Sequence, residues 1–167
     1  MEIERKFLIS APPAGLGKCS RHLIEQGYLS TSPVVRIRRE DETYYLTYKG
    51  EGLMAHEEYN LPLNAESYEH LKEKIDGCLI SKTRYLVPYK DGLTIELDHF
   101  RSPHEGLYLA EVEFPSIEDA ENFVPPEWFI KDVTDDPSYH NSTMYNKSLH
   151  LRSEQHLLHH HMVQTCR

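Results

Sequence analysis

The sequence is poor in cysteine and in long apolar runs, and both shortages limit what the protein can be. Its 167 residues include three cysteines, Cys19, Cys78 and Cys166. An odd number of widely spaced thiols argues against a disulfide framework or a zinc site and is typical of a reducing compartment. No apolar stretch approaches the roughly 20 residues that cross a bilayer, and the charged N-terminus lacks a signal-peptide core. We therefore expect a cytoplasmic protein.

Positive charge is also scarce. The 18 lysines and arginines face 27 acidic residues, which gives a formal net charge of −9. This balance argues against a nucleic-acid backbone or an anionic membrane as the main partner, although a local group of cations could still hold an anion. With 39% hydrophobic residues the chain can build one core, and we expect a single domain.

Short alternating segments dominate the sequence and predict a fold rich in β-strands. Eight strands are expected, over 2–9, 27–32, 34–40, 43–49, 55–63, 79–89, 93–100 and 107–114. Three helices are expected over 17–26, 65–76 and 117–123, the last two capped by Asn64 and Ser116. Polar turns at 90–92 and 102–106 imply consecutive antiparallel strands. The expected fold is α+β, mostly antiparallel: an eight-stranded closed barrel with a few flanking helices.

The first strand places three charges on one face. Because side chains alternate along a strand, Glu2, Glu4 and Lys6 share one surface. A Glu-x-Glu pair can bind a hard divalent cation, and a lysine one step further can contact a phosphate held by that cation. This segment predicts a site for a metal and a phosphate.

Paired charges recur on the polar faces of the later strands. The cations are Arg36, Arg38, Lys49, Lys82 and Arg84, and the carboxylates are Glu58, Glu96, Asp98, Glu111 and Glu113. A solvated sheet face is the usual explanation, but such a face normally mixes polar residue types, whereas these strands are mostly of one sign. Pointing inward, these charges would be too costly to bury without water, metal or a bound anion. We expect a wet tunnel that binds Mg²⁺ or Mn²⁺ and a chain of phosphates.

An ordered set of motifs supports this interpretation. It comprises Glu2-Ile3-Glu4-Arg5-Lys6, Arg36-Ile37-Arg38, Thr47-Tyr48-Lys49-Gly50, Glu58, Lys82-Thr83-Arg84, Glu96-Leu97-Asp98 and Glu111-Val112-Glu113. In this order they resemble the CYTH superfamily, the triphosphate tunnel metalloenzymes. The runs Gln26-Gly27-Tyr28-Leu29 and Trp128-Phe129 resemble small bacterial members that hydrolyse inorganic tripolyphosphate. The resemblance covers residues 1–149, the expected domain, whereas 150–167, with its several histidines, is expected to be a flexible tail.

The resemblance implies metal-dependent hydrolysis of inorganic tripolyphosphate to pyrophosphate and phosphate. Metal ligands would be Glu2, Glu4, Glu111 and Glu113, with Glu58, Glu96 and Asp98 as further ligands or groups that order water. Triphosphate would be bound by Lys6, Arg36, Arg38, Lys49 and Arg84. Neighbouring cations favour loss of the Lys82 proton, so Lys82 is expected to activate the attacking water, or else to bind phosphate. Tyr28 is a second candidate proton acceptor, or a hydrogen-bonded tyrosine of the barrel wall.

Three positions depart from the family pattern. His56 stands where an arginine occurs in some relatives, and Ser138 and His140 stand where relatives often have basic residues. Three classes of function remain open on the sequence: an inorganic triphosphatase; a related enzyme such as a class IV adenylate cyclase or thiamine triphosphatase; and a non-catalytic polyphosphate-binding module.

Overall fold

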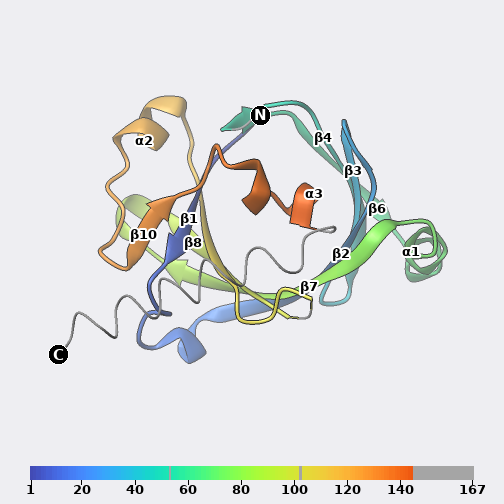
Figure 1. Ribbon diagram of the computed structural model, residues 1–167, viewed down its shortest axis with the longest axis horizontal. Coiled ribbons are helices and arrows are strands. Elements are labelled where there is room, and N and C mark those ends of the chain that lie inside the picture. The colour runs from blue at the N-terminus through green and yellow to red at the C-terminus, as the bar shows by residue number, and fades with distance from the viewer. Residues whose placement is uncertain (53, 102, 145–167) are drawn as a thin grey trace.

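An antiparallel β-sheet wraps into a nearly closed barrel (Figure 1). The computed structural model describes residues 1–52, 54–101 and 103–144. Its strands are β1 (Glu2–Ile9), β2 (Ser20–Thr31), β3 (Val34–Glu40), β4 (Thr43–Lys49), β5 (Ala55–His56), β6 (Glu58–Leu63), β7 (Asp76–Pro88), β8 (Thr94–Phe100), β9 (Tyr108–Glu113) and β10 (Phe129–Asp132). Their order is β10-β1-β9-β8-β7-β2-β3-β4-β6. Because β5 pairs with β1 and only Glu57 separates β5 from β6, this stretch links the two ends of the sheet. The expected antiparallel barrel is confirmed.

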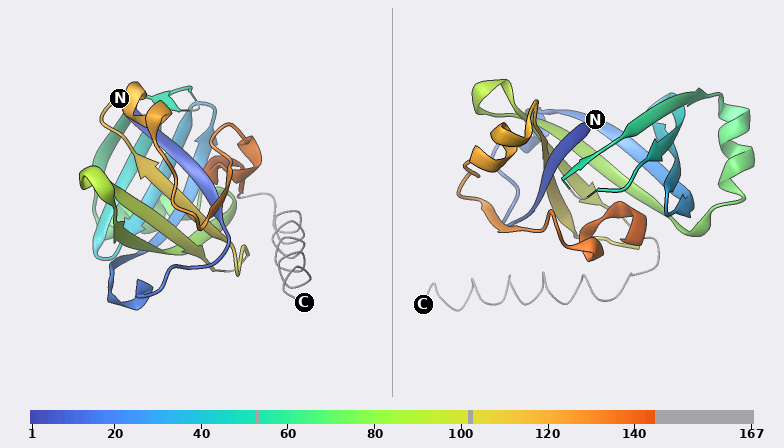
Figure 2. Two further views of the ribbon diagram at one scale, coloured as in Figure 1. Left: turned by 90° about the vertical axis from the view of Figure 1, so that its left-hand side faces the viewer. Right: turned by 90° about the horizontal axis from the view of Figure 1, so that it is seen from above.

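Short helices connect the strands. They are α1 (Ala65–Lys72), α2 (Ile117–Asn122) and α3 (Asn141–Met144), with single 3₁₀ turns η1 (Leu16–Lys18), η2 (Lys90–Gly92) and η3 (Pro137–Tyr139). The α1 and α2 helices lie near opposite ends of the molecule (Figure 2). As expected, Asn64 caps α1 and Ser116 caps α2, each accepting a hydrogen bond from a backbone N–H of the first turn. In the described part of the chain, no helix has the length and apolarity needed to cross a membrane.

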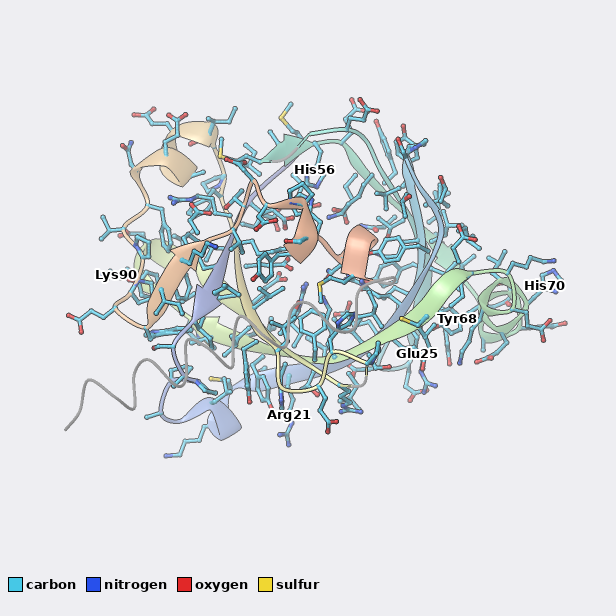
Figure 3. The ribbon with its side chains drawn as sticks, viewed as in Figure 1. Arg21, Glu25, His56, Tyr68, His70 and Lys90 are labelled. Carbon is cyan, nitrogen blue, oxygen red and sulfur yellow. The ribbon has the colours of Figure 1, made fainter. Side chains whose placement is uncertain are left out.

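The helix expected over 17–26 is wrong, because β2 begins at Ser20. Along this strand Arg21 and Leu23 are exposed while Ile24 and Gln26 are buried, which is a strand-like alternation. Arg21 accordingly lies on the outer side of the barrel (Figure 3). The strand pairs with β3 on one edge and β7 on the other, and these two ladders satisfy the backbone groups that a helix would pair internally.

Other differences are smaller. The helix expected over 65–76 ends at Lys72, and the strand expected over 55–63 is divided at Glu57. The four-residue β10, which follows two prolines and pairs with the end of β1, was not predicted. The expected tail, 150–167, lies outside the described residues, and the domain limits stay a prediction.

Two apolar clusters hold the barrel. One covers its outer side, where β1, β8 and β9 pack against α2 and β10; its buried members are Phe7, Ile9, Ile95, Leu97, Ala110, Val112, Phe114 and Ala120. The other lies inside, because Leu8, Ile80 and Leu109 share the inward faces of their strands with charged residues. Tyr139 and Met144, from η3 and α3, complete this inner cluster. It forms an apolar floor beneath the charged part of the interior.

The inner cluster gives a direct test of this architecture. We expect Leu109→Ala to reduce the free energy of unfolding by about 2–5 kcal/mol, since Leu109 is fully buried and its truncation leaves a cavity. The matched change Leu61→Ala, at a leucine that is 57% exposed, should stay within about 0.5 kcal/mol of the wild type. Urea unfolding followed by circular dichroism measures both. Equal losses in the two variants would contradict the assigned floor.

Candidate active site

A cavity of about 440 Å³ occupies the barrel interior. Its volume is in the range of small-molecule binding sites. The charged side chains that line it are Glu2, Glu4, Lys6, Arg36, Arg38, Lys49, Glu58, Arg84, Glu96, Glu111 and Glu113. Tyr28 also lines it. Of the site residues predicted from the sequence, all but Lys82 and Asp98 are therefore brought to one cavity.

The strand order separates the two signs of charge around the barrel. The neighbouring strands β1, β9 and β8 carry an acidic wall, which consists of Glu2, Glu4, Glu96, Glu111 and Glu113. Strands β7, β3 and β4 carry a basic wall, which consists of Arg36, Arg38, Lys49 and Arg84. Directly paired residues face the same side of a sheet, and the ladder pairs Glu4 with Glu113. Lys6 is the cation within the acidic wall.

Two carboxylates of the acidic wall have opposite titration behaviour. Burial, reinforced by the negative charge of Glu111, raises the pKa of Glu4 to about 8. Burial acts on Glu111 in the same direction, but the nearby cations Lys6 and Arg84 hold the pKa of Glu111 well below its usual value. The Lys6 Nζ lies 3.4 Å from Glu111 Oε1. At neutral pH Glu4 is therefore mostly protonated and Glu111 is ionised, because the nearby cations compensate burial at Glu111 but not at Glu4.

Near the chain start, Glu2 lies between two basic groups. Lys49 Nζ lies 3.5 Å from Glu2 Oε1 and 3.5 Å from Glu58 Oε2, and His56 Nε2 lies 3.3 Å from Glu2 Oε2. Burial opposes ionisation of Glu2, but the His56 hydrogen bond and the Lys49 charge lower its pKa to about 2. His56 is buried and points toward the interior (Figure 3). Oxygen or nitrogen atoms of Glu2, His56 and Glu58 lie within 4.8 Å of one another, close enough to hold one metal ion.

The acidic wall fits a divalent cation. Glu2 Oε2 contacts His56 at 3.3 Å and Glu111 Oε1 contacts Lys6 at 3.4 Å, and these long contacts leave both buried oxygens short of hydrogen-bond donors. Unsatisfied buried carboxylate oxygens are costly, and hard cations such as Mg²⁺ take oxygen ligands of this kind. A bound cation would also supply the positive charge that Glu4 lacks. Glu2, Glu4, Glu111 and Glu113 thus offer oxygen donors of the right kind, while the group of described residues that already brings three donor atoms within 4.8 Å is Glu2, His56 and Glu58.

Lys82 and Asp98 are enclosed in the wall instead of lining the cavity. Both side chains are fully buried, and Lys82 Nζ lies 2.6 Å from Asp98 Oδ2. Asp98 also accepts two hydrogen bonds from Arg84, at 2.7 and 2.8 Å. Burial lowers the pKa of Lys82 to about 7, because it outweighs the attraction of Asp98, and Arg84 adds to the effect. Arg84 in turn contacts Glu96 and Glu111 of the acidic wall.

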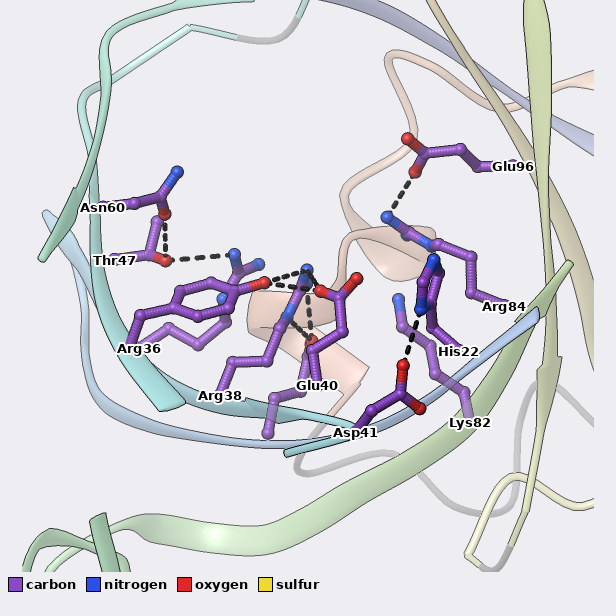
Figure 4. Close-up of polar contacts among 12 residues, drawn as sticks. His22, Arg36, Arg38, Glu40, Asp41, Thr47, Asn60, Lys82, Arg84 and Glu96 are labelled. Carbon is purple, nitrogen blue, oxygen red and sulfur yellow. Dashed lines mark hydrogen bonds and ion pairs between the residues drawn. The ribbon is translucent and has the colours of Figure 1, made fainter. Parts of the chain in front are cut away.

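The cations of β3 point into the interior, opposite Arg84 and Glu96 (Figure 4). Arg36 is 4% exposed, and burial together with the adjacent Arg38 lowers its pKa. Its Nη2 lies 3.4 Å from Thr47 Oγ1, which itself donates to Asn60 at 2.6 Å. Two guanidinium groups held side by side in a buried wall are costly unless an anion binds between the walls.

Some lining residues were not assigned a role from the sequence. Thr134, His140 and Asn141 come from the segment that carries η3 and α3. Lys6 ties this segment to β1, since its backbone N–H donates to Thr134 Oγ1 at 3.0 Å and its Nζ donates to Tyr139 O at 3.2 Å. His140 contacts Thr134 O through Nε2 at 2.9 Å. The segment is irregular, so no strand or helix period in the sequence marks which of its side chains face the cavity.

Comparisons with known proteins agree with this geometry. Residues 1–132 match the CYTH domain family, whose triphosphate tunnel metalloenzymes use divalent metals. The inorganic triphosphatase of Nitrosomonas europaea is 38% identical to this chain over 146 residues, which cover 86% of this chain and 95% of the relative. That of Acetivibrio thermocellus is 37% identical over 150 residues, with 86% and 92% covered. A crystal structure of an inorganic triphosphatase superposes with a TM-score of 0.67 at 35% identity, covering 88% of this chain and 95% of the other.

The raised pKa of Glu4 predicts a pH-dependent stability of the metal-free protein. Between pH 5 and 7 folded Glu4 keeps a proton that an ordinary carboxyl, with a value of 4.5, releases on unfolding. The free energy of unfolding should therefore fall as pH rises, by up to about 1.4 kcal/mol per unit. Glu96, whose pKa is also raised, acts in the same direction. His99 and His140, whose pKa values are lowered by burial, act in the opposite direction below the ordinary histidine value of 6.5, and Lys82 does so only above pH 7.

This contribution is measured by melting the protein in a chelator at pH 5, 6 and 7. The Tm should decline less steeply in Glu4→Gln than in the wild type, because the amide cannot titrate. Parallel declines in the two proteins would show that Glu4 titrates normally.

Proposed function

This chain belongs to the CYTH domain family, and we propose that it hydrolyses inorganic tripolyphosphate to pyrophosphate and phosphate with Mg²⁺ or Mn²⁺ as cofactor. The observation that carries the proposal is the cavity with an acidic wall facing a basic wall. A linear triphosphate with its metal has the complementary pattern: negative oxygens toward the cations and positive metal toward the carboxylates. The two curated relatives that share the greater part of this chain are inorganic triphosphatases.

Each wall has a separate part in binding. The metal would be held by Glu2, Glu4, Glu111 and Glu113, with Glu58 and Glu96 next to them. When bound, it would polarise phosphoryl oxygens and neutralise part of their charge. The phosphates would be held by Lys6, Arg36, Arg38, Lys49 and Arg84, the arginines through paired N–H groups and the lysines as point charges. Most of these cations are buried, which strengthens their attraction for charge that develops on the transferred group.

Hydrolysis also requires a group that takes a proton from water. Water oxygen forms a new bond to the terminal phosphorus, the bridging P–O bond breaks, and pyrophosphate leaves. We assign two candidates for the released proton. Tyr28 lines the cavity. Lys82 is enclosed in the wall, so it would receive the proton through a group between it and the cavity; with its pKa near 7 it is an uncharged amine in part of the population at neutral pH and in most of it at alkaline pH. Asp98, paired with two cations, is assigned to hold Lys82 and Arg84 in place.

The composition supports a cytoplasmic location without nucleic-acid or membrane partners, as the sequence predicts.

A panel of triphosphate substrates is the decisive test of function. With Mg²⁺ or Mn²⁺, tripolyphosphate should release phosphate faster than ATP or thiamine triphosphate, and ATP should give no cyclic AMP. Glu111→Gln keeps the side-chain volume but removes a negative ligand, so kcat/KM should fall by on the order of 10² or more. The same chemical change at the exposed loop residue Glu127, Glu127→Gln, should leave the rate unchanged.

Several results would overturn the proposed function. They are tripolyphosphate binding without turnover, cyclic AMP production, and a Glu111→Gln rate equal to that of Glu127→Gln. The first would identify a binding module and the second a cyclase.

Lys82 and Tyr28 are separated by substitution and pH. If Lys82 takes the proton, Lys82→Met should lower kcat by on the order of 10² with a smaller change in KM. The rise of wild-type kcat through about pH 7, where the lysine loses its proton, should also disappear. Tyr28→Phe should then retain that rise. A Lys82→Met enzyme with wild-type kcat and a raised KM would make Lys82 a phosphate-binding group and leave the proton to Tyr28.

A further inference from the structure

The side chain of Gln26 is fully buried in the barrel wall, in contact with Arg38 and Tyr28, which both line the cavity. It lies on β2, and the ladder places it directly opposite Arg38 on β3. Its Oε1 accepts two hydrogen bonds from Arg38, from Nε at 3.1 Å and from Nη2 at 2.7 Å. Its Nε2 donates to the Tyr28 hydroxyl at 3.1 Å. Gln26 therefore forms hydrogen bonds with both Arg38 and Tyr28.

Arg84 shows what a charged partner does in the same position. Asp98 binds the Nε and Nη2 of Arg84, just as Gln26 binds the Nε and Nη2 of Arg38. The two arrangements hold a guanidinium from the same edge, but Asp98 also neutralises its arginine, whereas an amide does not. Arg38 has Glu40 as an acidic neighbour, at 3.9 Å from Nη1, which is long for an ion pair (Figure 4).

We propose that Gln26 is a positioning residue that fixes the guanidinium of Arg38 in the cavity without neutralising it, and so keeps a full positive charge directed at the triphosphate. This inference rests on the proposed function for the identity of the anion. A neutral acceptor satisfies two N–H groups that would otherwise be buried without partners, which lowers the cost of holding Arg38 inside the wall. Nη1 of Arg38 donates to the Tyr45 hydroxyl at 3.4 Å, so the guanidinium that lines the cavity is held in place before substrate arrives.

The amide also couples this cation to Tyr28. Because Oε1 accepts from Arg38, the opposite edge of the amide must present its N–H groups, and one of these contacts the tyrosine oxygen. Arg36 forms a further hydrogen bond with Tyr28. The orientation of the Gln26 amide thus places an N–H donor at the Tyr28 hydroxyl and fixes the Nε and Nη2 edge of Arg38.

Two substitutions separate orientation from charge. Gln26→Leu has a similar size, leaves Arg38 charged and removes its fixed partner. Gln26→Glu keeps the shape and the two contacts, but neutralises Arg38 as Asp98 neutralises Arg84. Binding of tripolyphosphate is measured by calorimetry in a chelator, which makes the readout independent of metal and turnover. Both variants should bind at least about 10-fold more weakly than the wild type, and Gln26→Glu should do so with an equal or higher Tm.

Kinetics and salt distinguish the two variants further. Gln26→Glu should mainly raise KM, and its affinity should depend less on salt, because one net charge is missing. Gln26→Leu should lower kcat as well, because a misplaced cation supports the transition state less than the ground state. A purely structural Gln26 would instead give a lower Tm with wild-type affinity in both variants, and this would overturn the inference.

The action through Arg38 is tested by a double-mutant cycle. In an Arg38→Met background, Gln26→Glu should change the affinity for tripolyphosphate by less than about twofold. The same loss in both backgrounds would show that Gln26 does not act through Arg38. The cycle uses the isosteric variant, so it decides the matter even where Gln26→Leu does not fold. A wild type that binds tripolyphosphate without hydrolysing it would overturn the proposed function and leave this test intact, whereas no binding would overturn both.

Discussion

The mutual compensation of charges in an enclosed barrel is the constraint on which this structure depends. Each buried charge costs several kcal/mol unless a partner of opposite sign or a bound ion compensates it. The antiparallel ladder supplies such partners directly, because it places Lys6 beside Glu111, Arg84 beside Asp98 and Lys49 beside Glu58. The ladder instead pairs Glu4 with Glu113, and burial together with the nearby charge of Glu111 raises the pKa of Glu4. The proposed ligand would bind at the positions whose charges are left uncompensated.

The charged groups of the interior therefore fall into two kinds, those paired with a partner of opposite sign and those without such a partner. Asp98 forms ion pairs with both Lys82 and Arg84. These contacts hold the wall together, and Lys82 and Asp98 do not reach the cavity surface. The positive charge of Arg38 is not compensated by its nearest partner, Gln26, because that partner is neutral. Stability and binding make opposite demands on such groups: a paired charge stabilises the fold, while an unpaired one retains affinity for substrate. The barrel meets both demands by assigning them to different residues.

The alternation of the sequence was enough to predict the strands whose two faces differ, such as Val34–Glu40 and Thr43–Lys49, with their exact bounds. The same alternation identified most of the charged residues that line the cavity, because charges on an inward strand face are costly to bury unless they bind a partner or a ligand. The first half of β2 was missed, since its apolar pair Leu23-Ile24 interrupts the alternation and tertiary pairing on both edges overrides the local signal.

Strand order and partner choice could not be read from the sequence. The turn at 102–106 predicts that β8 and β9 are neighbours, but nothing in the spacing shows that β1 lies beside β9, which extends the acidic wall, or that Asp98 turns toward Lys82. Gln26 belongs to a run that resembles the family, but it carries no charge and was assigned no role, and the inward residues of the η3–α3 segment follow no period. These features depend on contacts between distant parts of the chain.

The order of the strands also has a consequence for how the site comes into being during synthesis. Arg36, Arg38 and Lys49 of the basic wall lie on β3 and β4, which are joined by a short turn and pair with each other. The acidic wall forms only when β1 pairs with β9, which is made much later in synthesis. Lys6 also contacts Tyr139, which lies 133 residues further along the chain. Local hairpins form before such distant pairings, whose loop-closure entropy is larger. A nascent chain would thus possess its cations early and acquire its complete set of carboxylate donors only when nearly the whole domain has emerged from the ribosome.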